Sequence, residues 1–287
     1  FEGRPAENDA PAQLRATLIS RNVDLGEWRS GGAAAPSAPS VAPSVAPTKG
    51  GAGPRPDTRF DAEVDWQIAT LTGAPLPQNL PITGWRAHAV WRDDRLALAP
   101  LAFAFAGGAA SGQVTLAPSA STAALQLTGL RLDQLGVPEL SGRLNARVAL
   151  RSRGESVDGL LSALAGTVDA DLQPGATLPA TLDAKLGLDG GRWLRTQLGG
   201  GGQRSAVRAA SLQLRLDQGI AAVQRLALET DTVLLTGAGS IDLPRRRVSV
   251  SVTPQRKQRA LFALDDTIKF DGALAAPTIS LARRVDQ

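Results

Sequence analysis

Residues 226–252, LALETDTVLLTGAGSIDLPRRRVSVSV, hold the pattern that decides the fold. Near the end of this stretch Val248, Val250 and Val252 alternate with serine and threonine. Because side chains in a strand point alternately to its two faces, this period of two places the valines on one side and the hydroxyls on the other. The stretch therefore predicts a strand with a single apolar face.

A second run of strand type, residues 233–242, precedes the valines, and residues 243–247 join the two runs as a turn. The run contains Gly237 and Gly239, where a missing Cβ atom permits a bulge or a bend. Two such runs with a short connection predict an antiparallel hairpin.

The same alternation recurs along most of the chain. It is clearest at residues 60–68, where apolar residues alternate with acidic and amide residues. Residues 13–28 predict a strand followed by a turn or short helix capped by Asp24. Further strands are predicted at residues 85–91, 96–105, 113–116, 124–127, 144–150, 167–172, 212–216, 220–228, 267–270 and 278–281.

Two stretches favour helices instead. Residues 156–165 carry a leucine stripe, with Ser156 or Asp158 as the candidate cap. Residues 180–198 form a longer stretch that three glycines interrupt. Together the patterns predict a mainly β fold, an antiparallel meander of about fourteen strands with one or two short helices.

The predicted organisation has four parts. Residues 1–30 read as the end of a preceding β unit, and the Pro/Ala/Ser/Gly-rich residues 31–57 as a linker or disordered loop. A β-meander unit is expected at residues 58–138. A C-terminal β unit follows at residues 139–287, with a helical insertion at about residues 156–198.

Composition excludes several classes of function. The chain of 287 residues has no cysteine, so disulfides and thiolate metal sites are excluded. A formal net charge of +4 and an aromatic content of 4% do not suit nucleic-acid binding. No run of about 18 apolar residues predicts a transmembrane helix. The chain starts at Phe1 and contains no methionine, which predicts a processed product or a piece of a longer protein.

Candidate catalytic groups are few. The single histidine, His88, has no second histidine or cysteine to complete a metal site, so we expect a solvated strand residue. The pairs Asp93–Asp94 and Asp265–Asp266 fall at predicted turns, where aspartate is favoured by the backbone. No serine stands at a telling distance from a histidine or lysine, and the glycine clusters lack the flanking residues of a phosphate-binding loop. We therefore predict no enzyme, no catalytic residue, no cofactor and no metal.

What covers the apolar face is the open question. A helix is about 10 Å wide and strands lie about 4.8 Å apart, so two helices shield only a few strands. The remaining face either packs on itself as a dry closed core, which makes the protein a structural or interaction module, or lines a groove for an apolar ligand. The residues predicted to line such a groove are Phe60, Val64, Trp66, Ile68, Phe103, Phe105, Leu212, Leu214, Leu216, Val248, Val250 and Val252.

A basic run lies beside the groove candidates. Arg245, Arg246 and Arg247 stand in a segment without acidic residues and could contact anionic head groups, each charge contributing about 1 kcal/mol near a lipid surface. A solvated turn explains the same residues.

Several stretches resemble one family. They are FDAEVDWQIATLTGAPLP from Phe60, LALAPLAFAFAGGAASGQVTL at residues 96–116, residues 140–175, DTVLLTGAGSIDLPRRRVSVSVTP and the closing FDGALAAPTISL. They resemble the C-terminal region of AsmA-like envelope proteins, which are related to TamB-type β-groove lipid-transfer proteins. The resemblance covers about four fifths of the chain through loose β-repeat patterns, without a catalytic signature.

The resemblance implies a location and a role. It implies a periplasmic protein of a Gram-negative bacterium, anchored in the inner membrane through an upstream helix that this sequence does not contain. It also implies that the sheet is twisted and curved into an apolar groove, similar to a β-taco or an open barrel. The implied ligand is phospholipid or another acyl-chain lipid, the implied role is phospholipid transport and outer-membrane biogenesis, and an envelope protein is a possible partner. The missing anchor and the Pro-rich residues 31–57 depart from the family pattern.

Overall fold

A computed structural model gives the fold of the chain. It describes residues 2–4, 12–26, 60–74, 79–117, 119–136, 139–154, 156–186, 203–257 and 266–283. Sixteen strands occur in these residues: β1 (Glu2–Arg4), β2 (Ala12–Asp24), β3 (Phe60–Thr72), β4 (Ile82–Arg92), β5 (Arg95–Phe105), β6 (Gly108–Leu116), β7 (Ser121–Arg131), β8 (Arg143–Ser152), β9 (Ala165–Leu172), β10 (Thr177–Pro179), β11 (Arg204–Asp217), β12 (Ile220–Thr230), β13 (Val233–Asp242), β14 (Arg247–Arg256), β15 (Asp266–Ala273) and β16 (Ala276–Arg283).

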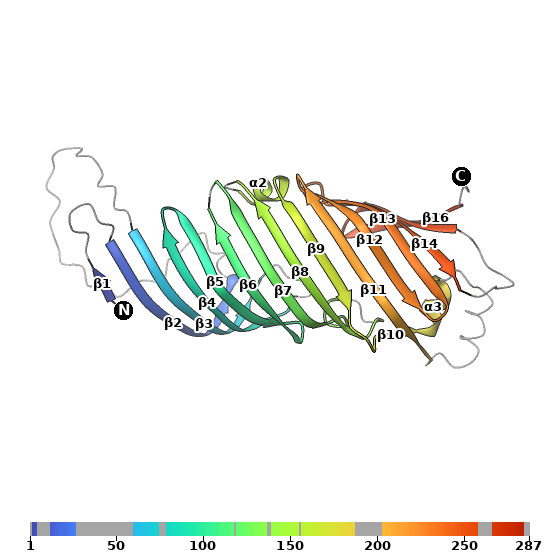
Figure 1. Cartoon of the computed structure of the whole chain (residues 1–287), viewed down its shortest axis with the longest axis horizontal. Coiled ribbons are helices and arrows are strands. Elements are labelled where there is room, and N and C mark those ends of the chain that lie inside the picture. Colours follow the sequence, from blue (N-terminus) through green and yellow to red (C-terminus); the bar gives the residue numbers. More distant parts are fainter. Residues whose placement is uncertain are drawn as a thin grey trace.

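Fifteen of these strands follow one another in a single hydrogen-bonded path from β1 to β16, and β10 pairs with β11 beside that path. In Figure 1 the strands lie side by side along the long axis of the molecule, with the N-terminal strands at one end and the C-terminal strands at the other. The path does not return to its start, so the described sheet is open. The mainly β fold and the curved open sheet predicted from the sequence are confirmed.

One pair of neighbours departs from the predicted antiparallel meander. Strands β2 and β3 are parallel, with Leu18 opposite Trp66, whereas every other pair in the path is antiparallel. A parallel pair requires the chain to return to the starting end of the first strand, which a tight turn cannot do. Residues 25–59 make that return connection, and the Pro-rich residues 31–57 within it lie outside the described residues.

The hairpin predicted at residues 233–252 forms in the structure. Strand β13 pairs with β14 from Val233 opposite Arg256 to Asp242 opposite Arg247. The bulge lies on a different strand, however, because the register shifts between Val223 and Leu226 of β12. Gly237 admits the Leu226 side chain instead, since a Cβ atom there would lie 2.3 Å from Leu226 Cδ2.

Tight turns join most neighbouring strands. The β4–β5 turn has Asp93 and Asp94 at φ of 48° and 57°, and the β11–β12 turn has Gln218 and Gly219 at 47° and 75°. Positive φ at both central residues suits the twist of a two-residue hairpin, and aspartate and glycine tolerate it best. The predicted turn at Asp93–Asp94 is confirmed. Asp265 and the glycines at 199–202 lie outside the described residues.

Two short helices interrupt the meander, at opposite ends of the strands in Figure 1. Helix α2 (Val157–Ser162) starts after Ser156, whose side chain accepts a hydrogen bond from the Gly159 N–H at 3.1 Å, so the predicted cap is confirmed. Helix α3 (Ala180–Leu186) begins where predicted, and residues 187–198 lie outside the described residues. The division of the chain into two β units at residue 138 stays a prediction. Strand β7 lies before this residue and β8 after it, and the two strands pair in the same sheet.

Sequence patterns missed the shortest strands and shortened others. The three-residue strands β1 and β10 are too short to show a period of two. Strands β6 and β7 extend well beyond the predicted residues 113–116 and 124–127. Their outer parts consist largely of alanine, glycine, serine and threonine, whose weak strand signal is overridden by pairing on both sides.

Candidate functional site

One line of register partners crosses the whole sheet. Each residue in it lies directly opposite the next, so all of them point to the same face. We call this line the apolar row because every member is hydrophobic or glycine: Leu18, Trp66, Ala87, Leu101, Gly112, Leu125, Val148, Val168, Leu214, Val223, Gly239, Val250, Phe270 and Ile279. At about 4.8 Å per strand, the row follows the sheet for roughly 60 Å.

The structure brings the twelve predicted groove residues to this face. Trp66, Leu214 and Val250 belong to the row itself. The others lie two, four or six residues along the same strands, which returns them to the same side: Phe60, Val64, Ile68, Phe103, Phe105, Leu212, Leu216, Val248 and Val252. Residues as far apart in the sequence as Phe60 and Val252 therefore share one surface. Whether that surface holds lipid stays a prediction.

The opposite face is polar. Its own line of register partners is made of small, hydroxyl, amide and charged residues: Gln113, Ala124, Ala149, Thr167, Arg215, Ala222, Ser240, Ser249, Asp271 and Thr278. In β7 the alternation is complete, with half-buried Leu125 and Leu127 between exposed Ala124, Gln126 and Thr128. The sheet is thus amphipathic across its width.

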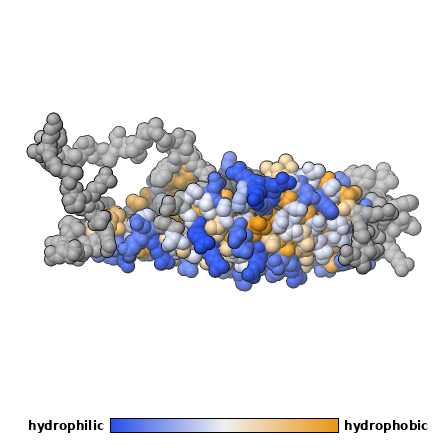
Figure 2. Space-filling view, turned by 90° about the horizontal axis from the view of Figure 1, so that it is seen from above, coloured by the Kyte–Doolittle hydropathy of each residue, from blue (hydrophilic) through white to orange (hydrophobic). Residues whose placement is uncertain are grey.

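The apolar face is half-buried along most of its length. Val64, Trp66, Leu125, Val148, Leu212, Leu214, Val248, Val250 and Val252 are neither fully buried nor fully exposed. The described strands belong to one sheet, and the two described helices contain six and seven residues. No second sheet layer covers this face within the described residues. Seen from above, hydrophobic residues lie among hydrophilic ones along the molecule (Figure 2).

Aromatic side chains fill the face near its N-terminal end. Trp66 meets Trp85 edge to face with ring centroids 6.4 Å apart, and Trp85 stacks on Phe103 at 5.5 Å. These rings pack against a buried cluster that contains Ile68 and Ile82. The Ile68 residue is only 3% exposed, so this end of the face is well packed.

Helix α3 packs on the face at its other end. Leu182 of the helix packs against a buried cluster of Ala176, Leu178 and Val207, together with Leu228 of β12. Asp183 of the helix is fully buried, and its two carboxylate oxygens accept hydrogen bonds from the Thr230 and Thr232 hydroxyls, both at 2.7 Å. These bonds join the helix to the β12–β13 turn. The alternation patterns contained no sign of Asp183, because a helix residue finds its partners only through tertiary packing.

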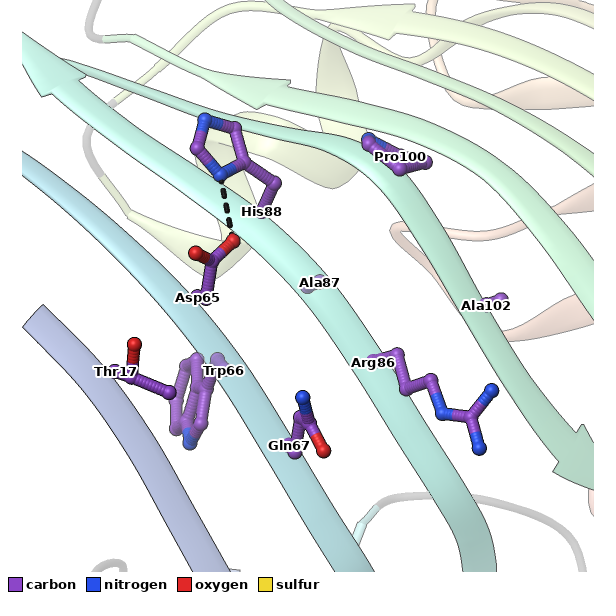
Figure 3. Close-up of a pocket in the computed structure, with 9 residues that line it drawn as sticks. All are labelled: Thr17, Asp65, Trp66, Gln67, Arg86, Ala87, His88, Pro100 and Ala102. Carbon is purple, nitrogen blue, oxygen red and sulfur yellow. Dashed lines mark hydrogen bonds and ion pairs between the residues drawn. The ribbon is translucent and has the colours of Figure 1, made fainter.

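His88 lies on the polar face beside two carboxylates. Its Nδ1 is 2.9 Å from Asp65 Oδ1 (Figure 3). Its Nε2 is 3.5 Å from Glu63 Oε1. The His88 side chain is 31% exposed. The prediction of a solvated histidine did not include its two carboxylate partners. The acidic alternation of residues 61–65 was visible in the sequence, but the β3–β4 register that sets Asp65 opposite His88 was not.

His88 and Asp65 border a shallow cavity of about 370 Å³ on the polar face. Its lining includes Thr17, Gln67, Arg86 and Pro100 around the His88–Asp65 pair (Figure 3). Glu63 also accepts a hydrogen bond from Arg15 at 2.9 Å. That bond and the Arg15 charge lower the pKa of Glu63, which favours its ionised carboxylate. Both nitrogens of His88 face carboxylates, which leaves neither of them directed at a nucleophile.

The arginine turn at 245–247 lies at one end of strands β13 and β14. Arg245 donates from its Nη1 to Asp242 Oδ2 and from its backbone N–H to Asp242 Oδ1, both at 2.9 Å. These bonds lower the pKa of Asp242. Arg245, one of the three predicted head-group contacts, is therefore bound to an aspartate. Arg246 is exposed in the turn, and Arg247 is the exposed first residue of β14. Head-group contact by this turn stays a prediction.

Among the described residues, no group of three or more histidine, aspartate or glutamate side chains is placed to hold a metal ion. No helix in the described ranges is long and apolar enough to cross a bilayer.

Comparison with known proteins gives one informative match. The chain is 24% identical over 209 residues to the AsmA family protein YhjG of Escherichia coli strain K12. The match covers 69% of this chain but only 30% of the relative, so the chain spans less than a third of that protein's length. No family model matches the chain. No solved structure matches it either. The alignment supports the resemblance to AsmA-like envelope proteins that the β-repeat stretches carry.

Proposed function

We propose that this chain is a non-enzymatic, lipid-accommodating segment of a periplasmic AsmA-like protein that carries phospholipid or another acyl-chain lipid between the inner and outer membranes. The membrane anchor in this proposal is an upstream helix outside the given sequence. An envelope protein is a possible partner, and phospholipid supply to the outer membrane is the biological role.

The continuous apolar row is the observation that carries the proposal. A half-buried hydrophobic face crossing fourteen strands has no second layer over it in the described part of the chain. Acyl chains are suitable occupants, because each CH₂ removed from water contributes about 0.8 kcal/mol. Since the row follows the sheet for roughly 60 Å, a lipid can move from strand to strand without leaving an apolar surface.

Polar head groups suit the ends of the strands. A lipid whose chains lie on the apolar face must keep its head group in water, because an unpaired charge is costly in apolar surroundings. The turn that carries Arg246 and Arg247 lies at such an end. This arrangement allows cationic side chains to meet phosphate while the acyl chains stay on the face.

Photocrosslinking in cells tests the proposal. A photoreactive residue replaces Val64, Val148 or Val250 on the apolar face, and the matched control replaces the exposed Ala149, which follows Val148 on the opposite face. We expect lipid adducts at the first three positions and none at Ala149. Native mass spectrometry of the purified protein should show bound lipid. A lipid-free protein, or equal labelling at Val148 and Ala149, would refute the proposal.

A further inference from the structure

The two ends of the sheet differ in how they are protected against pairing with another chain. Strand β16 is the last strand of the path, and its far edge has no partner strand in the described residues. Thr278, Ile279, Ser280 and Leu281 are all exposed, with Ile279 at 65% and Leu281 at 54%. Residues 277–282, PTISLA, contain no charged side chain. Natural edge strands usually carry charges, bulges or a covering segment to prevent such pairing.

The opposite edge is better protected. Strand β1 pairs with β2 along Gln13, Leu14 and Arg15. The remaining length of β2 exposes Leu18 and Ile19, at 50% and 77%, but unlike residues 277–282 it also carries a charge, the exposed Arg21. Arg15 is exposed as well. Positive charge along an edge discourages a neighbouring strand of the same kind. The C-terminal edge is therefore the one suited to recruit a strand.

Pro277 indicates which backbone groups face outward. Proline has no N–H, so within a sheet it fits at an edge where its nitrogen points away from the neighbouring strand. Pro277 lies opposite Gly272 of β15. Because backbone N–H and C=O groups alternate sides along a strand, those of Ile279 and Leu281 then face the open edge as well.

The edge is also complementary to itself. If two β16 strands run antiparallel about Ile279, that residue meets its own copy, Pro277 meets Leu281, and Thr278 meets Ser280. Apolar residues then oppose apolar ones on one face and hydroxyls oppose hydroxyls on the other, without like charges in contact. We infer that a second copy of this chain binds here, through antiparallel β16–β16 pairing centred on Ile279.

This pairing continues the apolar face from one copy to the next. Ile279 ends the apolar row on β16, so the two rows meet at the dimer axis. The contact is isologous and closes on itself, as in most homodimers. An eight-residue strand buries less surface than a standard interface, so the dimer forms reversibly with concentration. The inference rests on the edge alone and does not depend on lipid binding.

Cysteine scanning provides a direct test, because the chain has no cysteine of its own. Opposed residues in a hydrogen-bonded antiparallel pair have Cα atoms about 5.5 Å apart, within disulfide range. In the Ile279→Cys variant the two thiols are opposed. In the matched Thr278→Cys variant they are two register positions apart, with Cα atoms roughly 8 Å from each other. We expect the disulfide dimer to form at least about tenfold faster in the first variant.

Analytical ultracentrifugation of the cysteine-free chain supplies a second readout. The sedimentation coefficient should rise with concentration for the native chain. The Ile279→Lys variant should stay monomeric, because it places two like charges at the centre of the pair. The Ile279 side chain is mostly exposed in the monomer, so the change should not disturb the fold. Equal crosslinking rates for the Ile279→Cys and Thr278→Cys variants would overturn the inference. A second result would also overturn the inference: the native chain stays monomeric, and the thiol introduced by Ile279→Cys is shielded from alkylation. Another occupant would then cover the edge.

Discussion

Gly239 on β13 lies directly opposite Val250 on β14, and only a glycine allows this approach. A Cβ atom at position 239 would lie 2.7 Å from Val250 Cα and 2.2 Å from Ser249 O. The φ angle of Gly239, +144°, is also one that other residues rarely adopt. Gly112 and Gly166 repeat the relationship, each with a Cβ position 2.0 Å from a carbonyl oxygen of the neighbouring strand. Glycines of this kind let a sheet bend sharply.

The Gly239→Ala substitution should therefore lower the free energy of unfolding by about 2–4 kcal/mol, from backbone strain and steric overlap together. Gly84→Ala is the matched control, because Gly84 has a φ of +60° and open space around its Cβ position. Its expected loss is about 1–2 kcal/mol. Urea denaturation measures both values. Equal losses would show that the close approach at Gly239 adds nothing.

The Asp183→Ala substitution should release helix α3. It removes the acceptor of two hydroxyl hydrogen bonds in a fully buried position, and we expect a loss of about 2–4 kcal/mol in unfolding free energy. Asp183→Asn should lose less, since it keeps one oxygen acceptor. Asp171→Ala changes an exposed aspartate on β9 and should stay within about 0.5 kcal/mol of the native value. Hydrogen exchange should show opening confined to α3 and the β12–β13 turn. An Asp183→Ala protein as stable as native would contradict this role.

Acid should weaken the arginine turn. The hydrogen bonds from Arg245 hold the pKa of Asp242 below its usual value of 3.8. Because the folded pKa is the lower one, the stabilisation is present above pH 3.8 and is lost as the pH falls through the folded pKa. In Arg245→Ala the pKa of Asp242 should rise but stay below its usual value, since the backbone N–H of residue 245 still donates. Carbon-13 NMR titration of the carboxyl group measures it, with Arg92→Ala as the control. An unchanged pKa in Arg245→Ala would exclude the side-chain bond as the cause.

A charge on the apolar row should expel lipid. Leu125→Lys places an ammonium group in the middle of the row, where contact with acyl chains costs solvation energy. Gln126→Lys makes the same change on the next residue, which faces the polar side. We expect several-fold less lipid to copurify with Leu125→Lys, whereas Gln126→Lys should retain the native amount. Lipid phosphate per mole of protein is the measurement. Equal lipid content in the two variants would speak against the row as the binding surface.

The alternation of apolar and polar residues predicted which side chains of a strand share a face. It did not predict how the strands pair with one another. The alternation at residues 248–253 and 60–68 identified which side chains share a face, because that depends only on neighbouring residues. It could not reveal that β2 and β3 are parallel, nor that His88 lies between Asp65 and Glu63. Those relations depend on register and on the long connection at residues 25–59, which local patterns do not encode.

The sequence by itself determined that the chain forms amphipathic strands, where most of them turn, and that the valines of β14 belong to an apolar face. The tertiary structure alone decided that these strands join one open sheet, so that Val250 continues a row reaching Leu18 on β2. It also decided that Asp183 is buried under the β12–β13 turn and that β16 ends the sheet. The physical reason is that strand alternation is local, whereas strand order and the burial of a face arise from hydrogen bonds between distant segments.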